Sequence, residues 1–229
     1  MEPIDICYTP LDVPARPNID IQKFIEWSKS VYPQIAKYSS KNSESFIGKQ
    51  YPWDLVFGCY DGKWLDDFEN KFPELAEYSY KTFLIKREEL NSIIFLPTRP
   101  HVKGISFWHS DVDLTGFRFY VECEHFEKNP LVIRKTVLPN NTLNGIYLQI
   151  NSDDDRLQKE IYNCNMISPH QAYYINNCRA VHAPSMEVSG VRIAGFVTVK
   201  EQYSTIVRQR VRDLIVNSAE KFKDHAILW

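Results

Sequence analysis

Short segments of alternating apolar and polar residues dominate the second half of the chain. The alternation from 117 to 123 is strict, which predicts a strand with two faces: Phe117, Phe119, Val121 and Cys123 on one, and Arg118, Tyr120 and Glu122 on the other. Segments rich in β-branched and aromatic residues predict further strands at 93–96, 105–113, 131–137, 145–150, 171–176, 179–183 and 191–199. Because only one short helix, near 155–162, is expected among them, the pattern predicts a jelly roll or barrel.

Helical periodicity is found toward the two ends of the chain. An extended, proline-punctuated arm over residues 1–18 precedes a helix that Asp20 can cap, and a later helical segment from 64 to 78 is interrupted by a proline. Residues 53–65 are interpreted as two short strands around a turn at Asp61–Gly62. After residue 203 an apolar stripe predicts a C-terminal helix, with Ile206, Val207, Val211, Leu214, Ile215, Ala219 and Phe222 on one face.

These patterns predict the α+β class, mainly β with flanking helices. At 229 residues and 44% hydrophobic content, the chain can bury one substantial core, and one domain is favoured over two. We expect an N-terminal helical and extended scaffold (1–90), a β core (91–200) and a C-terminal helix (201–229). That last helix is expected to pack on the barrel or on the second subunit of a homodimer.

Charge, terminal sequence and cysteine content limit the classes of partner and the location that we expect. A formal net charge of -2 with both signs scattered gives no basic stripe for nucleic acid, so a small-molecule partner is expected. The N-terminus lacks the pattern of a signal peptide, and no stretch has the length of a membrane span. The five cysteines are odd in number and lack CxxC spacing, which favours a reducing compartment and a cytoplasmic location.

The candidate chemistry begins at His109 and Asp111. In an extended segment these two side chains project to the same side, so an imidazole and a carboxylate can share one metal ion. A non-haem iron(II) site takes two histidines and one carboxylate, and His182 is the candidate for the second histidine. If the loop after His182 forms a hairpin with its tip near Glu187, Arg192 lies opposite His182 and can bind a carboxylate in bidentate fashion.

Other pairs fit less well. A second H-x-[DE] match, His125 and Glu127, runs into a turn-like segment that ends at Pro130, and no downstream histidine pairs better with it than with His109. His170 with Arg179 is another possible pair, although the segment between them is typical of a strand rather than a turn.

The sequence resembles the family of iron(II)- and 2-oxoglutarate-dependent oxygenases. GISFWHSD, the distant His182 and an arginine ten residues later are similar to the family's H-x-D…H…R signature, over roughly residues 90–200. The segments FRFYVE and QAYYINNCRAVHAPSMEVSGVRI are similar to the aspartyl/asparaginyl β-hydroxylase-like branch, which includes free-proline hydroxylases. This chain has Tyr120 where that branch often carries another histidine.

The resemblance implies a double-stranded β-helix in which His109, Asp111 and His182 bind iron(II) and Arg192 binds the far carboxylate of 2-oxoglutarate. It also implies a dioxygenase that uses iron(II), 2-oxoglutarate and O2 to hydroxylate an unactivated C–H bond, with release of succinate and CO2. Because the protein supplies its own carboxylate ligand, hydroxylation is favoured over halogenation.

The substrate is expected to be a free amino acid or a derivative, provided that the polar face of the 117–123 strand lines the barrel. The Arg118 guanidinium can bind a carboxylate through two N–H groups, and the Tyr120 hydroxyl can form a hydrogen bond. The Glu122 carboxylate can bind an ammonium group. A solvated face is the alternative for these three residues.

Two other functions stay open. One is a different metal-dependent cupin-like enzyme, a hydrolase or isomerase that holds zinc or manganese with the same three ligands; the arginine after His182 argues against it. The other is a non-catalytic β-barrel binding module with structural histidines.

Overall fold

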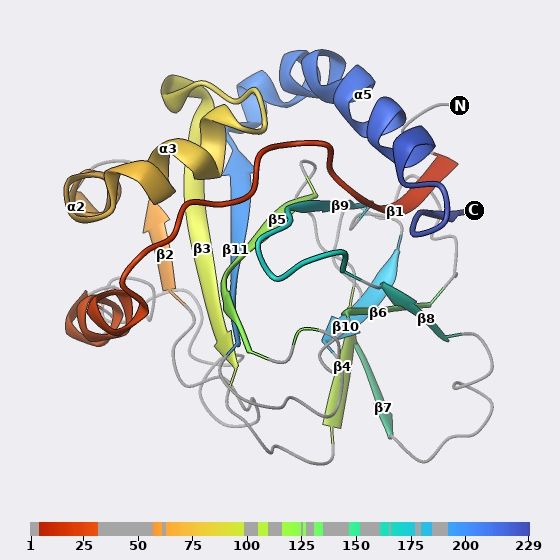
Figure 1. Cartoon of the computed structure of the whole chain (residues 1–229), viewed down its shortest axis with the longest axis horizontal. Helices are drawn as coiled ribbons and strands as arrows, with labels where there is room; N and C mark the ends of the chain where they lie inside the picture. Colours follow the sequence, from red (N-terminus) through yellow and green to blue (C-terminus); the bar gives the residue numbers. More distant parts are fainter. Residues whose placement is uncertain are drawn as a thin grey trace.

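The strands form two antiparallel sheets in this computed structural model (Figure 1). The structure describes residues 5–31, 57–60, 63–98, 105–109, 116–124, 126, 131–134, 147–151, 161–164, 166–176, 180–184 and 192–229. The large sheet has the order β12 (Ile227–Leu228), β1 (Ile6–Pro10), β9 (Tyr173–Ile175), β5 (Phe117–Cys123), β11 (Arg192–Val199), β3 (Leu90–Thr98), β2 (Phe57–Tyr60). The small sheet has the order β7 (Tyr147–Asn151), β4 (Ile105–His109), β10 (Val181–Pro184), β6 (Leu131–Arg134), β8 (Ile161–Cys164).

Most strands lie where alternation predicted them, and three further strands were missed. β1 lies inside the predicted extended arm, and the short β12 follows the C-terminal helix. β8 covers residues 161–164, so the predicted helix near 155–162 is wrong at its end, and its first part lies outside the described residues. β8 is a strand because β6 supplies its hydrogen-bonding partners, from Leu131 opposite Cys164 to Arg134 opposite Ile161.

The helical segments follow the sequence closely at the N-terminal side. Residues 21–31 are helical, and the Asp20 carboxylate caps them by accepting a hydrogen bond from the Lys23 amide at 3.0 Å. The predicted helix from 64 to 78 is two helices, α2 (Lys63–Lys71) and α3 (Pro73–Lys81), with the proline in the first turn of α3, where its missing N–H costs no hydrogen bond.

The predicted hairpin over residues 53–65 is wrong. β2 pairs with β3, and the residues that follow the expected turn form α2. The physical reason is that Leu65 and Phe68 are spaced for one face of a helix, and both are fully buried there. Two short 3-10 helices, η2 (Arg87–Glu89) and η4 (Glu201–Tyr203), precede β3 and the C-terminal helix.

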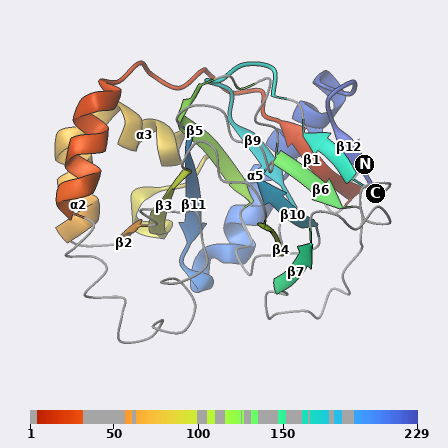
Figure 2. The same cartoon turned by 90° about the horizontal axis from the view of Figure 1, so that it is seen from below.

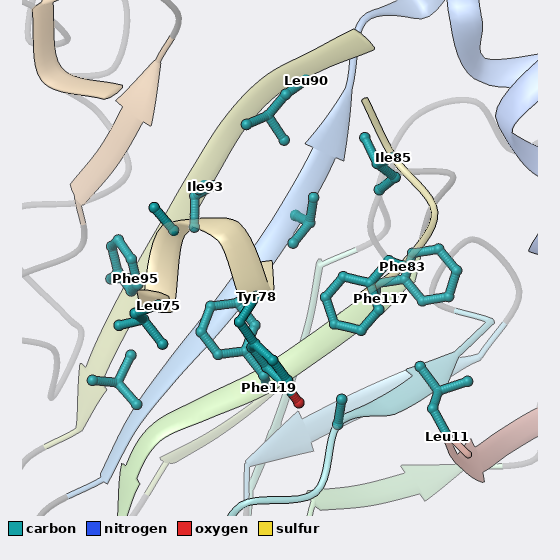
Figure 3. Packing of buried hydrophobic residues seen from close by; sticks show 14 of the residues in the cluster. Leu11, Leu75, Tyr78, Phe83, Ile85, Leu90, Ile93, Phe95, Phe117 and Phe119 are labelled. Atoms are coloured by element: carbon teal, nitrogen blue, oxygen red, sulfur yellow. The ribbon is translucent and has the colours of Figure 1, made fainter. Parts of the chain in front are cut away.

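One face of the large sheet packs against the helices and forms the main apolar core. Figure 3 shows the aromatic centre of this helix-side core, where Leu75 and Tyr78 of α3 meet the side chains of β3 and β5. The rings of Phe83 and Phe117 are stacked with centroids 4.9 Å apart, and Tyr78 meets Phe119 edge-on at 5.9 Å. Such contacts fix the large sheet as a rigid platform.

The C-terminal helix α5 (Ser204–Lys221) also packs on the helix-side core. Val207, Val211, Ile215 and Ala219 of the predicted stripe are buried, whereas Ile206 is 54% exposed. Ile206 precedes Val207 by one position, which turns it about 100° away from the buried stripe. None of the helices in the described part of the chain combines the length and the apolar character needed to cross a membrane.

The other face of the large sheet is buried against the small sheet. Figure 2 shows β4, β6, β7 and β10 gathered on the side away from α2 and α3. The contacts between the sheets form the interior cluster, which we define as Cys7, Tyr8, Tyr120, Cys123, Ile133, Cys164, Tyr173, Ile175, Ala180 and Ala194. β5 therefore separates two buried layers, with Phe117 and Phe119 in the helix-side core and Tyr120 in the interior cluster.

A β-bulge interrupts the alternation of β5. The pairing with β11 runs from Arg118 opposite Phe196 to Tyr120 opposite Ala194, and then skips Val121, so that Glu122 lies opposite Ile193. The extra residue shifts every later side chain by one face. Cys123 thus lies in the interior cluster rather than with the phenylalanines, which corrects the predicted apolar face.

Candidate functional site

Two of the predicted metal ligands lie opposite each other in the small sheet. β10 pairs with β4 through one register position, His182 with His109. On its other side His182 pairs with Ile133, a member of the interior cluster. Residues directly opposite each other lie on the same face of a sheet. His182 therefore shares the face of Ile133, which meets the large sheet, and its side chain is 3% exposed.

The His182 ring is held by its own strand. Nδ1 lies 3.0 Å from the carbonyl oxygen of Ala180. A carbonyl only accepts, so Nδ1 carries the proton and the neutral ring has its lone pair on Nε2. This arrangement is typical of metal-binding histidines, whose other nitrogen donates to a carbonyl or carboxylate.

The third predicted ligand, Asp111, lies outside the described residues, as do His125, Glu127 and Arg179. Within the residues that the structure describes, no group of three His, Cys, Asp or Glu side chains could hold a metal ion. The described part of the candidate site therefore consists of the two histidine positions and the polar residues of the large sheet.

Arg192 begins β11 and is buried, with 3% exposure, on the interior side. Its Nη2 donates to the hydroxyl of Tyr120 at 3.1 Å, and its Nε and Nη1 have no hydrogen-bond partner among the described residues. The Tyr173 hydroxyl lies 3.4 Å from the same Tyr120 oxygen. If Tyr120 accepts from both groups, its own O–H is left to donate, so this corner presents donors only and suits an anion.

The predicted hairpin between His182 and Arg192 is wrong. β10 pairs with β4 and β6, and β11 pairs with β3 and β5, so the chain crosses from one sheet to the other between these strands. Both hydrogen-bonding edges of each strand are already occupied, which leaves no edge for a β10–β11 ladder. His182 and Arg192 thus belong to facing sheets rather than to neighbouring strands.

Arg118 is buried on the same side of the large sheet, with 2% exposure. Its guanidinium lies 3.7 Å from the centre of the Phe196 ring, and in register it is opposite both Phe196 and Tyr173. The solvated alternative for Arg118 and Tyr120 is thus wrong. Stacking on an aromatic ring fixes the plane of a guanidinium and so the direction of its N–H donors.

Glu122 does not share the face of Tyr120, because the bulge separates them. Its carboxylate accepts a hydrogen bond from the Cys123 amide at 2.8 Å and is near Arg16 and His170. Burial lowers the pKa of His170, Arg16 lowers it further, and Glu122 acts in the opposite direction. Glu122 is therefore grouped with Arg16 and His170, away from the Arg192 corner.

Two tyrosines and one cysteine of the interior cluster stay protonated at neutral pH. Burial raises the pKa of the Tyr8 and Tyr173 hydroxyls and of the Cys164 thiol well above their ordinary values. Among the described residues, Arg118 and Arg192 are the buried charged side chains on this side of the large sheet. These two guanidinium groups favour the binding of carboxylates.

Sequence reasoning missed Tyr173, Phe196 and Arg16. Tyr173 and Phe196 lie on predicted strands, but strand pairing, which the pattern does not give, brings them to Tyr120 and Arg118. Arg16 lies in a segment interpreted only as an extended arm, and its position gave no signal.

No family model matches the chain, and no curated protein does. Among solved structures, the chain is similar to the non-heme alpha ketoglutarate dependent carbocyclase SnoK from nogalamycin biosynthesis, with 10% identity and a TM-score of 0.39. That match covers 89% of this chain and 87% of the other.

Proposed function

We propose that this protein is an iron(II)- and 2-oxoglutarate-dependent dioxygenase that hydroxylates a small carboxylate-bearing substrate. The observation that carries the proposal is the register position at which His182 lies opposite His109. These histidines are 73 residues apart in the sequence and were selected from it as ligands of one metal ion.

The two histidine positions and the buried polar corner support the metal and the cosubstrate. Side chains directly opposite each other on neighbouring strands are close enough to share an ion, and the Ala180 carbonyl orients the His182 ring for ligation through Nε2. Asp111, two positions beyond His109, would supply the carboxylate. The donor-only corner of Arg192 and Tyr120 fits one carboxylate of 2-oxoglutarate.

The strand orders support a double-stranded β-helix. The run β3-β11-β5-β9 lies within the large sheet and the run β4-β10-β6-β8 within the small one. The chain alternates between the sheets from β3 to β6 and again from β9 to β11. Such alternation is the connectivity of a jelly roll, in which a ligand lies between the two sheets.

When bound, iron(II) with 2-oxoglutarate and O2 supplies the oxidation of a C–H bond and yields succinate and CO2. The protein's own residues orient the reactants and exclude water. Arg192 and the Tyr120 hydroxyl would hold the cosubstrate carboxylate in a buried corner, where charge-assisted hydrogen bonds are strong. The hydrogen bond to the Ala180 carbonyl would fix the orientation of the His182 ring, so that Nε2 points toward the metal.

A second carboxylate would bind at Arg118. Along β11, the positions opposite Arg118 and Cys123 are Phe196 and Arg192, four residues apart, which is about 13 Å at the rise of a strand. One buried guanidinium can therefore serve the cosubstrate and the other a substrate such as a free amino acid. Glu122, on the far side of the bulge, is not proposed as a substrate ligand.

The direct test is metal analysis of protein purified without chelator, together with 2-oxoglutarate-dependent succinate formation. His182→Ala should lose iron binding and turnover. Arg192→Gln should keep iron and raise the Kd for 2-oxoglutarate by a large factor, because loss of a buried arginine from a carboxylate costs about 2–5 kcal/mol.

The alternatives give different results in the same assays. Zinc or manganese with no succinate would indicate a cupin-like hydrolase or isomerase, and the absence of any bound metal would indicate a binding module. Amino acids and amino-acid-derived acids should raise succinate formation above the uncoupled rate, and less so in Arg118→Ala. Stimulation by peptides or carboxylate-free compounds alone would contradict the substrate class.

A further inference from the structure

Arg16 of the N-terminal arm contacts β5 at the bulge. The pairing of β9 with β5 covers Phe117 and Arg118 and ends there, so no strand among the described residues pairs with the next residues of β5 on that side. The Arg16 Nε donates to the Tyr120 carbonyl at 2.8 Å and replaces the missing ladder bond. The arm, the red segment that crosses the strands in Figure 1, thus reaches the residue whose side chain binds Arg192.

Arg16 is itself held firmly. Its side chain is buried, with 6% exposure of the residue, its Nη1 donates to the Pro17 carbonyl at 2.7 Å, and its amide donates to the His170 carbonyl at 3.1 Å. The Glu122 carboxylate, turned to this side by the bulge, is the nearby opposite charge. A rigid planar guanidinium can hold such a backbone position more precisely than a flexible ammonium group.

We infer that Arg16 is a positioning residue for the carboxylate-binding corner: it fixes the bulge of β5 and through it the place of the Tyr120 hydroxyl relative to Arg192. This inference rests on the proposed function, because the corner is assigned there to 2-oxoglutarate. A small rotation of the Tyr120 backbone displaces the hydroxyl at the far end of its side chain, and displacements of about 1 Å can change binding and rates strongly.

The test compares Arg16→Gln and Arg16→Lys with Arg210→Gln. Arg210 is a matched control because it is a half-buried arginine that donates to the Glu89 carboxylate and to the Leu84 carbonyl, neither of which belongs to β5. Arg16→Gln should raise the KM for 2-oxoglutarate about tenfold, in the range for residues that support a ligand-binding group, with kcat at saturation within about twofold. Arg16→Lys should recover part of this loss, and Arg210→Gln should lower the Tm without changing KM.

A measurement on the protein without 2-oxoglutarate tests this inference independently of the proposed function. With 3-fluorotyrosine placed at position 120 alone, the ¹⁹F resonance should shift or broaden in Arg16→Gln and stay unchanged in Arg210→Gln. An unchanged KM and resonance in Arg16→Gln, or equal changes in Arg210→Gln, would overturn the inference. If wild type does not consume 2-oxoglutarate, the proposed function is wrong, and the ¹⁹F resonance alone tests the positioning role of Arg16. If Arg16→Gln does not fold, the same measurements on Arg16→Lys test that role.

Discussion

Leu84 has a backbone conformation that favours glycine. Its φ is 58°, and the hydrogen bonds from Leu84 to Lys81 and from Ile85 to Tyr80 form the C-terminal motif that ends α3. The Leu84 side chain is 46% exposed, so little packing compensates for the left-handed conformation. Leu84→Gly should therefore raise the free energy of unfolding by about 1 kcal/mol, measured by denaturant titration.

Leu84→Ala provides the control, because alanine has the same conformational penalty as leucine and fewer contacts. It should be no more stable than wild type. Equal stability of the Gly and Ala variants would show that the strain at this residue is negligible.

The buried carboxylate of Glu89 connects η2 to α5. Arg210 donates to both of its oxygens at 2.6 and 2.7 Å, and the Lys86 amide donates at 2.9 Å. The hydrogen bonds from Arg210 lower the pKa of Glu89. Arg210→Gln should cost about 2 kcal/mol at pH 7, because it leaves a buried charge without its partner.

The sign of the pH dependence follows from that lowered pKa. In wild type, the stabilisation is complete above the ordinary glutamate pKa of about 4.3 and is lost as the pH falls through the lowered folded value. In Arg210→Gln the unpaired carboxylate favours protonation instead. The difference in unfolding free energy between the two proteins should therefore narrow below about pH 4.3, and a constant difference across pH would contradict the ion-pair explanation.

At the scale of elements, β11 packs closely against β5 at Gly195. A Cβ atom at this position would lie 2.4 Å from Cζ of Phe119, whose ring is enclosed by Tyr78, Phe83 and Phe95. These neighbouring rings restrict the movement of the Phe119 ring. Gly195→Ala should therefore cost about 2 kcal/mol of unfolding free energy by overpacking.

A double-mutant cycle identifies the cause. In a Phe119→Leu background the ring is absent, so Gly195→Ala should cost much less. If the cost is the same in both backgrounds, contact with Phe119 is not its source.

At the scale of the molecule, sequence reasoning found most strands, because the alternation of a strand is a local signal. Alternation identified β5, and the H-x-D pair with a later histidine and arginine selected His109, His182 and Arg192. Sequence reasoning failed where the structure depends on which strands pair with each other. The sheet to which β11 belongs depends on β3 and β5, and no local pattern distinguishes that from a hairpin with β10.

The bulge at Val121 shows the same limit within one strand. Its sequence, FRFYVEC, alternates without interruption, so nothing in it indicates that Cys123 and Glu122 exchange faces. The extra residue is recognised only from the register with β11.

The central place of β11 has a consequence for how the protein is made. β11 lies between β3 and β5, and β1 pairs with β12, so the large sheet joins residues near both ends of the chain. During synthesis β3 and β5 emerge long before the strand that separates them. Until then, the backbone N–H and C=O groups on the edges that will pair with β11 have no strand partner. Refolding from denaturant should also be slow, because β11 must find β3 and β5 across about 70 to 100 residues of chain. Its yield should fall as protein concentration rises, because intermolecular strand pairing competes with this long-range pairing.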